Sequence, residues 1–115
     1  MQIGAGGLGS PCSLYLTAAG IKQLTIIDSD ILDISNLQRQ ILYNETQIGK
    51  NKVDSAKEVL NELNSEVEIE VFKEYVDEDS IKKHIKDHDY IIDCSDNFQT
   101  KFLVNRIALK YNSHF

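Results

Sequence analysis

Apolar positions along this chain follow two patterns: short runs or strict alternation in some segments, and a spacing of three or four residues in others. The first pattern is typical of buried strands and occurs in four segments, residues 1–3, 24–27, 67–71 and 90–94. The second is typical of helices that pack on a sheet and predicts helices at residues 8–19, 50–63, 77–88 and 100–110. Gly20 is suited to end the first helix.

The alternation of strands and helices predicts an α/β fold, a Rossmann-like, doubly wound and mostly parallel sheet with helices on both faces. Because crossovers between parallel strands are right-handed, few topologies remain, and we expect the strand order 3-2-1-4. Residues 29–49 form a polar connection in which we expect a short helix at 36–42. Connections of this length inside a compact domain are usually functional or disordered.

The composition indicates one ordinary globular domain, because 115 residues, 42% of them hydrophobic and 26% charged, suffice for one core. No apolar run approaches the roughly 20 residues that span a bilayer. The net charge of −6 argues against a nucleic-acid surface but not against one bound nucleotide. Cys12 and Cys94 lie far apart in sequence, which is typical of reduced thiols in a cytoplasmic protein and indicates neither a disulfide framework nor zinc ligands.

A glycine-rich segment, "IGAGGLG", directly follows the first predicted strand. Gly4, Gly6 and Gly9 have the spacing G-x-G-x-x-G, which lets a backbone turn tightly and approach a pyrophosphate closely. Asp28 ends the second strand about 20 residues further on, where a carboxylate can bind a ribose hydroxyl. Strand, glycine turn, helix, strand and acid together predict a nucleotide site.

The two ends of the chain indicate a piece of a longer protein. A phosphate-binding glycine loop normally follows a strand of about five residues, whereas three residues precede it here, and residues 111–115 resemble the opening of a further strand. We therefore expect residues 1–115 to form a single nucleotide-binding domain that is truncated at both ends.

Candidate site residues converge on one edge of the predicted sheet. Ligands of doubly wound sheets bind at the carboxyl ends of the strands where the strand order reverses, here between the first and fourth strands. The glycine loop, Asp28 and residues 95–97 each follow a strand, and Arg39 and Lys52 lie in or beside the polar connection. Two cations, with a metal that Asp96 could hold, suit a triphosphate better than a dinucleotide.

Simpler interpretations of these residues stay open. Taken singly, Arg39 and Lys52 are compatible with solvated surface charges, and Asp96 with a cap on the last helix. Two other functions use the same glycine loop: an NAD-dependent oxidoreductase domain, and a non-catalytic nucleotide-binding scaffold that docks a partner. The absence of apparent hydride-transfer residues disfavours the oxidoreductase.

Five motifs, in order along nearly the whole chain, resemble a known family. They are Gly4-Ala5-Gly6-Gly7-Leu8-Gly9, Asp28-Ser29-Asp30, Asn36-Leu37-Gln38-Arg39-Gln40, Gly49-Lys50-Asn51-Lys52 and Asp93-Cys94-Ser95-Asp96-Asn97. Together they are similar to the MoeB/ThiF/HesA adenylyltransferases, the bacterial relatives of ubiquitin-activating enzymes. The combination is far more specific than the glycine loop alone.

The resemblance implies a reaction and its participants. ATP would adenylate the C-terminal glycine carboxylate of a ubiquitin-like sulfur-carrier protein, in thiamin or molybdopterin biosynthesis, with release of pyrophosphate. Charge neutralisation and in-line positioning suffice for this chemistry without a protein nucleophile. The family also implies a homodimer for the full-length protein.

The motif matches imply a role for each site residue. Gly7 would lie against the phosphates, Asp28 would bind the ribose, and Asp96 would bind Mg²⁺ with Asn97 beside it. The residues that would contact the triphosphate are Asn36, Arg39 and Lys52, and the implied catalytic residues are Arg39, Lys52 and Asp96. The same motifs make further nucleotide-binding candidates of Gly4, Gly6, Gly9, Asp30, Ser35 and Gln38.

Some features of the family are missing from these residues. Members usually carry two C-x-x-C pairs for zinc and an N-terminal helix whose arginine reaches a neighbouring subunit's ATP, and neither occurs here. We therefore expect that this chain alone does not turn over. Gln38 before the arginine favours the sulfur-carrier branches over the branch of tRNA-modifying dehydratases.

Overall fold

The computed structural model describes residues 1–85 and 90–110. Its regular elements, in chain order, are β1 (Gln2–Ile3), α1 (Gly9–Ala19), β2 (Gln23–Ile27), 3₁₀ helices at Ile34–Asn36 and Glu45–Gln47, α2 (Lys52–Leu63), β3 (Glu68–Phe72), α3 (Glu78–Ile85), β4 (Ile92–Asp93) and α4 (Phe98–Lys110). None of the helices described in these two ranges is long and apolar enough to cross a membrane.

The four strands form one parallel sheet in the order β3-β2-β1-β4. The predicted order 3-2-1-4 is therefore confirmed. β1 is central, with Gln2 beside Ile26 of β2 on one side and Ile92 of β4 on the other. The strand order reverses between β1 and β4, and the chain leaves β1 there through the glycine loop.

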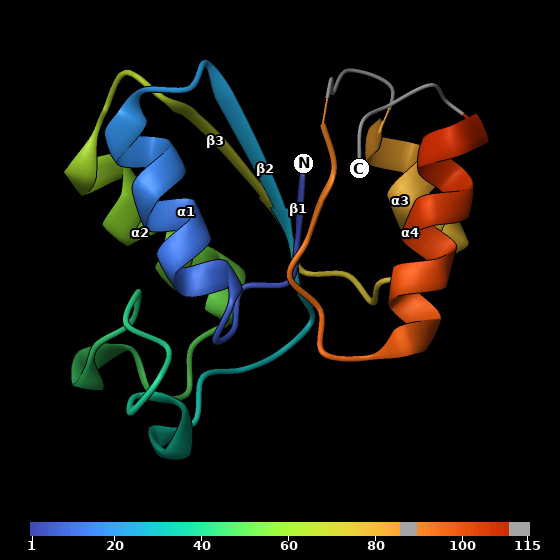
Figure 1. Ribbon diagram of the computed structural model, residues 1–115. Coiled ribbons are helices and arrows are strands. Elements are labelled where there is room, and N and C mark those ends of the chain that lie inside the picture. Colours follow the sequence, from blue (N-terminus) through green and yellow to red (C-terminus); the bar gives the residue numbers. More distant parts are fainter. Residues whose placement is uncertain (86–89, 111–115) are drawn as a thin grey trace.

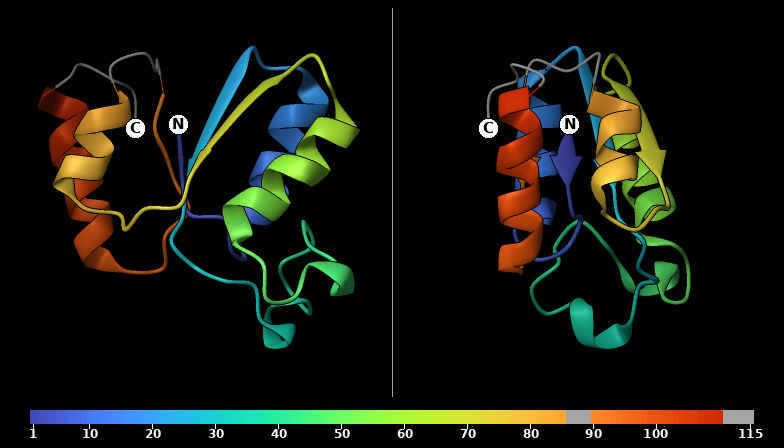
Figure 2. Two further views of the ribbon diagram at one scale, coloured as in Figure 1. Left: turned by 180° about the vertical axis from the view of Figure 1, so that it is seen from behind. Right: turned by 90° about the vertical axis from the view of Figure 1, so that its right-hand side faces the viewer.

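Helices cover both faces of the sheet, as the α/β pattern predicts. Figures 1 and 2 show α1 and α2 together on one face and α3 and α4 on the other. Successive residues of β2 point to opposite faces, so Ile26 packs into the core beneath α1 and α2, and Ile27 into the core beneath α3 and α4. Each side chain is fully buried. The two cores, one on each face of the sheet, fix the positions of the strand ends.

Helix ends follow local capping chemistry. Gly20 ends α1 in the left-handed conformation, with φ of 81°, and its N–H donates to carbonyls of the last turn, as predicted. α4 begins at Phe98, two residues before the predicted start, because the Asn97 side-chain oxygen accepts a hydrogen bond of 2.8 Å from the Thr100 N–H. The cap of this helix is therefore Asn97, whereas the sequence interpretation considered Asp96.

The long connection between β2 and α2 lies at the carboxyl ends of the strands, at the bottom of Figure 1. The helix predicted at residues 36–42 is wrong: a 3₁₀ helix at Ile34–Asn36 is followed by turns. Asp33 and Asn36 close a capping box at the start of this turn, which places the beginning of the helical element at Ile34, ahead of the predicted start. Leu32 and Leu42 anchor the connection in the core.

Two other boundaries differ from the sequence prediction. β4 pairs only at Ile92–Asp93, whereas the apolar run covered 90–94. The predicted end of α3 at residue 88 lies outside the described residues, as does the segment 111–115.

Candidate nucleotide-binding site

A cavity of about 730 Å³ lies at the carboxyl ends of β1, β2 and β4. The glycine loop, the end of β2, the long connection, the β3–α3 loop and the β4–α4 loop all line it. This is the edge at which the strand order reverses, where the topology predicts a ligand. The predicted site residues in its lining are Gly4, Gly6, Gly7, Asp28, Asp30, Asn36, Arg39, Lys52, Asp96 and Asn97.

Gly4 makes the sharp exit from β1 that the glycine loop requires. Its φ is +94°, a conformation that side-chain-bearing residues rarely adopt, and its N–H donates to the Ile27 carbonyl at 2.9 Å. A Cβ at this position would lie 3.0 Å from the carbonyl oxygen of Cys94. The loop can therefore run closely past β4 only with glycine at position 4.

Gly9 lies outside the cavity lining and has a packing role. A Cβ there would lie 2.3 Å from the Gly4 carbonyl oxygen and 2.9 Å from Gln2 Nε2. The buried Gln2 amide donates to the carbonyls of Gly4 and Gly9. Gly9 thus allows the start of α1 to pack directly on the end of β1, the task of the last glycine in this motif.

Asp28 and Tyr43 tie the glycine loop to its neighbours. The Asp28 carboxylate accepts hydrogen bonds of 2.8 Å from the backbone N–H groups of Ala5 and Asp30. Tyr43, from the long connection, donates its hydroxyl to the Ala5 carbonyl at 2.6 Å. Burial, with the nearby Asp28 and Asp30 charges, raises the pKa of Tyr43, so that its hydroxyl stays a donor. The loop is thereby fixed before any ligand arrives.

Lys52 is a buried cation in the cavity wall. It is the first residue of α2, and it is 5% exposed. Its backbone N–H donates to the Asp30 carbonyl at 3.0 Å, and its Nζ lies 3.6 Å from Asp30 Oδ2. Because a buried ammonium needs a counter-charge, and Asp30 is largely exposed, Lys52 is suited to hold an anion in the cavity.

Arg39 is exposed and lies over the glycine loop. Its Cδ would be 3.8 Å from a Cβ on Gly7, and its Nη1 donates to the Ser35 carbonyl at 3.3 Å. Ser35 is outside the cavity lining and acts here through its backbone, and Gln38 is exposed and also outside it. The structure therefore does not bring these two predicted residues to the cavity.

The β4–α4 loop is shaped by a buried carboxylate. Asp93 accepts hydrogen bonds from the N–H and hydroxyl of Ser95, and its Oδ2 lies 3.3 Å from Lys101 Nζ. Lys101 also donates to the Ser95 carbonyl at 3.0 Å. This network leaves Asp96, the next residue, exposed at the cavity.

The two cysteines, distant in sequence, meet beside the cavity. The Cys94 thiol lies close to that of Cys12 on α1, and both residues are partly buried. Burial, then the Cys12 thiol and the Asp93 charge, raise the pKa of Cys94 to about 12. Cys94 lines the cavity but is not an activated nucleophile.

Sequence reasoning did not single out several residues of the cavity wall, among them Gln40, Tyr75 and Val76. Gln40 is 3% exposed, and its buried side-chain oxygen has no hydrogen-bond partner among the described residues. Its place in the motif Asn36–Gln40 was the available signal. Tyr75 and Val76 come from the β3–α3 loop. Nothing in their local pattern marks them, because the crossover alone brings that loop to the cavity.

The family assignment follows from the match over almost the whole chain. Residues 2–115 match the family described as "ThiF family". The chain belongs to the ThiF family. It is 41% identical over 107 residues to the adenylyltransferase and sulfurtransferase UBA4 of Debaryomyces hansenii, and 42% identical over 110 residues to a probable molybdopterin-synthase adenylyltransferase of Porphyra purpurea. These matches cover 93% and 96% of the chain but 24% and 29% of the two relatives.

Superposition on solved structures confirms the Rossmann-type fold of this chain. PaaA superposes with a TM-score of 0.87 at 34% identity, covering 97% of this chain and 35% of PaaA. The tRNA N6-threonylcarbamoyladenosine dehydratase TcdA of E. coli, in complex with ATP, superposes with a TM-score of 0.91 at 25% identity, covering 98% of this chain and 47% of TcdA. The ThiF-family chain thus spans about a quarter of its curated relatives and a third to a half of these structures.

Proposed function

We propose that the cavity binds ATP and that the protein adenylates the C-terminal glycine carboxylate of a ubiquitin-like sulfur carrier. The observation that carries the proposal is the meeting of a fixed glycine loop with Lys52 and Arg39 in one cavity. Backbone N–H groups and two cations match the concentrated charge of a triphosphate. An ATP complex of TcdA and the names of the adenylyltransferase relatives support the choice of nucleotide.

We propose that residues of the cavity lining contact each part of the nucleotide. The glycine loop, Arg39 and Lys52 would hold the phosphates, and Asn36 and Gln40 supply amide groups nearby. Asp28 retains free lone pairs beyond its two backbone contacts and is suited to a ribose hydroxyl. Tyr75 and Val76 supply an apolar wall for the base. We propose these roles for this chain on the basis of their positions.

Asp96 fits Mg²⁺ better than a metal that needs several protein ligands. The described residues hold no cluster of three or more His, Cys, Asp or Glu side chains that could bind a metal ion. Mg²⁺ characteristically uses one or two carboxylates together with substrate phosphates and water. The exposed Asp96 carboxylate at the cavity suits that role. Mg²⁺ bound there would neutralise phosphate charge.

The residues of this chain would then position two anions against their mutual repulsion. The carrier carboxylate oxygen attacks the α-phosphorus, a P–O bond forms, and the bond to the pyrophosphate oxygen breaks. Lys52 and Arg39 stabilise the charge that accumulates on the phosphate oxygens. The reaction needs no protein nucleophile, in agreement with the raised pKa of Cys94.

The partner assignment rests on the relatives. Their names join adenylyltransferase with sulfurtransferase or with molybdopterin synthase, and both suit a sulfur-carrier substrate. We propose that the longer protein is a cytoplasmic homodimer. The carrier would dock on it, and the remaining three quarters of such a protein would supply the docking surface.

Pyrophosphate exchange in the longer native protein tests the proposal. Arg39→Ala and Asp96→Ala should each reduce carrier-dependent exchange of labelled pyrophosphate into ATP by at least about a hundredfold, because each removes charge stabilisation at the phosphates. Lys50→Ala, an exposed lysine outside the cavity, is the matched control and should exchange normally. Normal exchange in Arg39→Ala or Asp96→Ala would remove that residue from the site.

Ligand titration separates the alternative functions. Magnesium-dependent binding of ATP in preference to NAD supports adenylation. Preference for NAD would support an oxidoreductase domain instead. Retained partner binding without nucleotide binding would identify a non-catalytic scaffold.

A further inference from the structure

We propose that Glu74 and His84 form a clamp that positions Tyr75 and Val76 as the base-binding wall of the cavity. The inference rests on the proposed function, because it assigns positioning residues to the same nucleotide site. The Glu74–His84 clamp lies outside the five sequence motifs and on the opposite side of the sheet from the glycine loop's helix.

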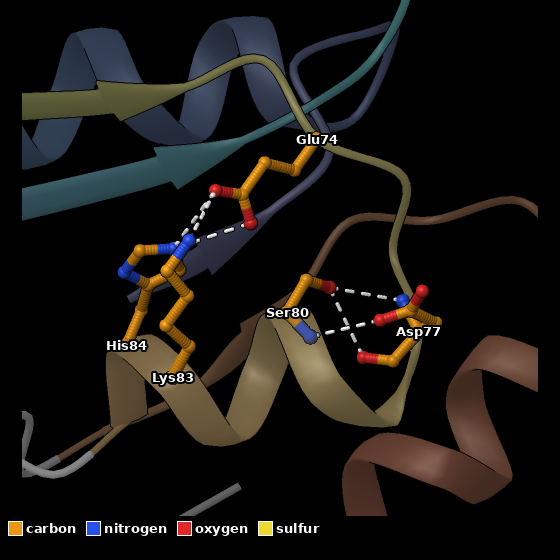
Figure 3. Close-up of polar contacts among 5 residues, drawn as sticks. All are labelled: Glu74, Asp77, Ser80, Lys83 and His84. Carbon is orange, nitrogen blue, oxygen red and sulfur yellow. Dashed lines mark hydrogen bonds and ion pairs between the residues drawn. The ribbon is translucent and has the colours of Figure 1, made fainter.

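Glu74 reaches from the β3–α3 loop back to helix α3. Figure 3 shows its carboxylate facing His84 and Lys83. Its two oxygens lie 3.4 and 3.3 Å from His84 Nε2, and Oε1 lies 3.3 Å from Lys83 Nζ. The side chain of His84 is 9% exposed, whereas that of Lys83 is 67% exposed. The contact with His84 is therefore the better ordered one, since exposed ion pairs contribute little.

His84 is itself held in place by Phe72, the last residue of β3. The two rings stack with centroids 3.8 Å apart and planes inclined by 19°. Phe72 in turn packs against the core beneath α3 and α4. The imidazole thus connects the end of the strand with the carboxylate two residues further along the chain.

A second contact fixes the other end of the same loop. The Asp77 carboxylate accepts a hydrogen bond from the Ser80 N–H at 2.8 Å, and the Ser80 hydroxyl bonds to the Asp77 backbone (Figure 3). This pair caps helix α3. Glu74 and Asp77 therefore bracket the two residues that line the cavity.

The bracketed residues depend on these tethers to different degrees. Val76 packs against the core, but the Tyr75 side chain is 80% exposed and has little packing of its own. The position of Tyr75 at the cavity is therefore set by its backbone, which Glu74 anchors one residue before. A wall that is ordered in advance avoids an entropic cost when a ligand binds. The clamp should therefore favour ligands that carry a base.

Hydrogen exchange and ligand affinity in the longer native protein test the clamp. Glu74→Ala and His84→Leu remove it, Glu74→Gln retains a hydrogen-bond acceptor, and Lys83→Met is the matched control. In the nucleotide-free protein, amide exchange at residues 73–77 should accelerate in the first two variants and stay normal in Lys83→Met. ATP affinity should fall by about three- to tenfold, while affinity for inorganic tripolyphosphate should not change. Glu74→Gln should recover part of the ATP affinity.

The outcomes distinguish the clamp from the proposed function. Unchanged exchange at residues 73–77 or unchanged ATP affinity in Glu74→Ala and His84→Leu would overturn the clamp. Equal losses for ATP and tripolyphosphate would also overturn it, because they would indicate general damage to the site. A wild-type protein that binds no ATP would refute the proposed function, whatever the exchange data show.

Discussion

The two sides of the cavity are built in different ways. On the glycine-loop side, Asp28 and Tyr43 hold the backbone of Ala5 through short hydrogen bonds, of which the one from Tyr43 is buried. On the α3 side, Glu74 and His84 hold the wall through a contact between two side chains. The first side therefore presents a backbone held by buried partners, whereas the second presents the exposed Tyr75 side chain. Rigidity is therefore greatest where the proposed phosphates lie.

The largest expected effect comes from disrupting the glycine-loop side. Gly9→Ala should lower the free energy of unfolding by about 3 kcal/mol or more, because its Cβ would overlap the Gly4 carbonyl and the atoms there are backbone. Gly6→Ala is the matched control for stability, since the nearest atom to its Cβ is 3.5 Å away. Urea unfolding of the nucleotide-free protein measures both. Equal stability of the two variants would contradict the close packing of α1 on β1.

A second test addresses Cys94, which lines the cavity and lies against Gly4 of the glycine loop. Because its pKa is raised to about 12, the thiolate is scarce at neutral pH and is gained only as the pH rises toward that value. Alkylation of Cys94 at pH 8 should be slower by about a hundredfold or more than in the unfolded chain. Mass spectrometry of iodoacetamide-labelled peptides measures this. Rapid alkylation of Cys94 in the folded protein would show that its thiol is activated.

Removing one hydrogen bond from the glycine-loop side should have an intermediate effect. Tyr43→Phe leaves the Ala5 carbonyl without its buried donor and should cost about 1–3 kcal/mol of unfolding free energy. Tyr15→Phe, at a side chain that is 76% exposed, is the control and should cost almost nothing. Chemical denaturation compares them. A neutral Tyr43→Phe would mean that the loop does not depend on this tether.

The smallest effect is expected on the α3 side, at Glu78. A hydrogen bond and the charge of Lys82 lower the pKa of this exposed carboxylate below 4.5. The stability that the charged Glu78 contributes to the folded state is therefore present above pH 4.5, and it is lost as the pH falls through the lower pKa of the folded protein. NMR titration of the Glu78 carboxyl measures the shift, and Lys82→Met should move the pKa back upward. A Glu78 pKa that Lys82→Met leaves unchanged would contradict this ion pair.

The sequence was sufficient for the features that depend on local chemistry. Gly20 ends α1 because a left-handed residue is needed there, and the alternation of strands and helices implied the sheet order. The motifs also placed Lys52 and Asp96 on the same edge. Their proposed roles remain predictions, because position alone does not establish a ligand contact.

Features that depend on three-dimensional proximity were not accessible in this way. Tyr75 and Val76 reach the cavity only through the crossover. The clamp joins Glu74 to His84, and neither residue belongs to a sequence motif. The pattern at 36–42 was misleading, because the helical turn that forms is capped by Asp33 and covers only Ile34–Asn36. Likewise, the meeting of Cys12 with Cys94 follows from the placement of β4 beside β1.

The central position of β1 has a consequence for folding. Gln2 pairs with Ile26 on one side and with Ile92 on the other, so the middle of the sheet joins early and late parts of the chain. Contacts between residues so distant in sequence are slow to form, because a long loop must close first. During synthesis, β2 and β3 with α2 can assemble before Ile92 has emerged from the ribosome. The described cavity is then completed only when β4 docks beside β1, so the proposed nucleotide site forms after these elements have assembled.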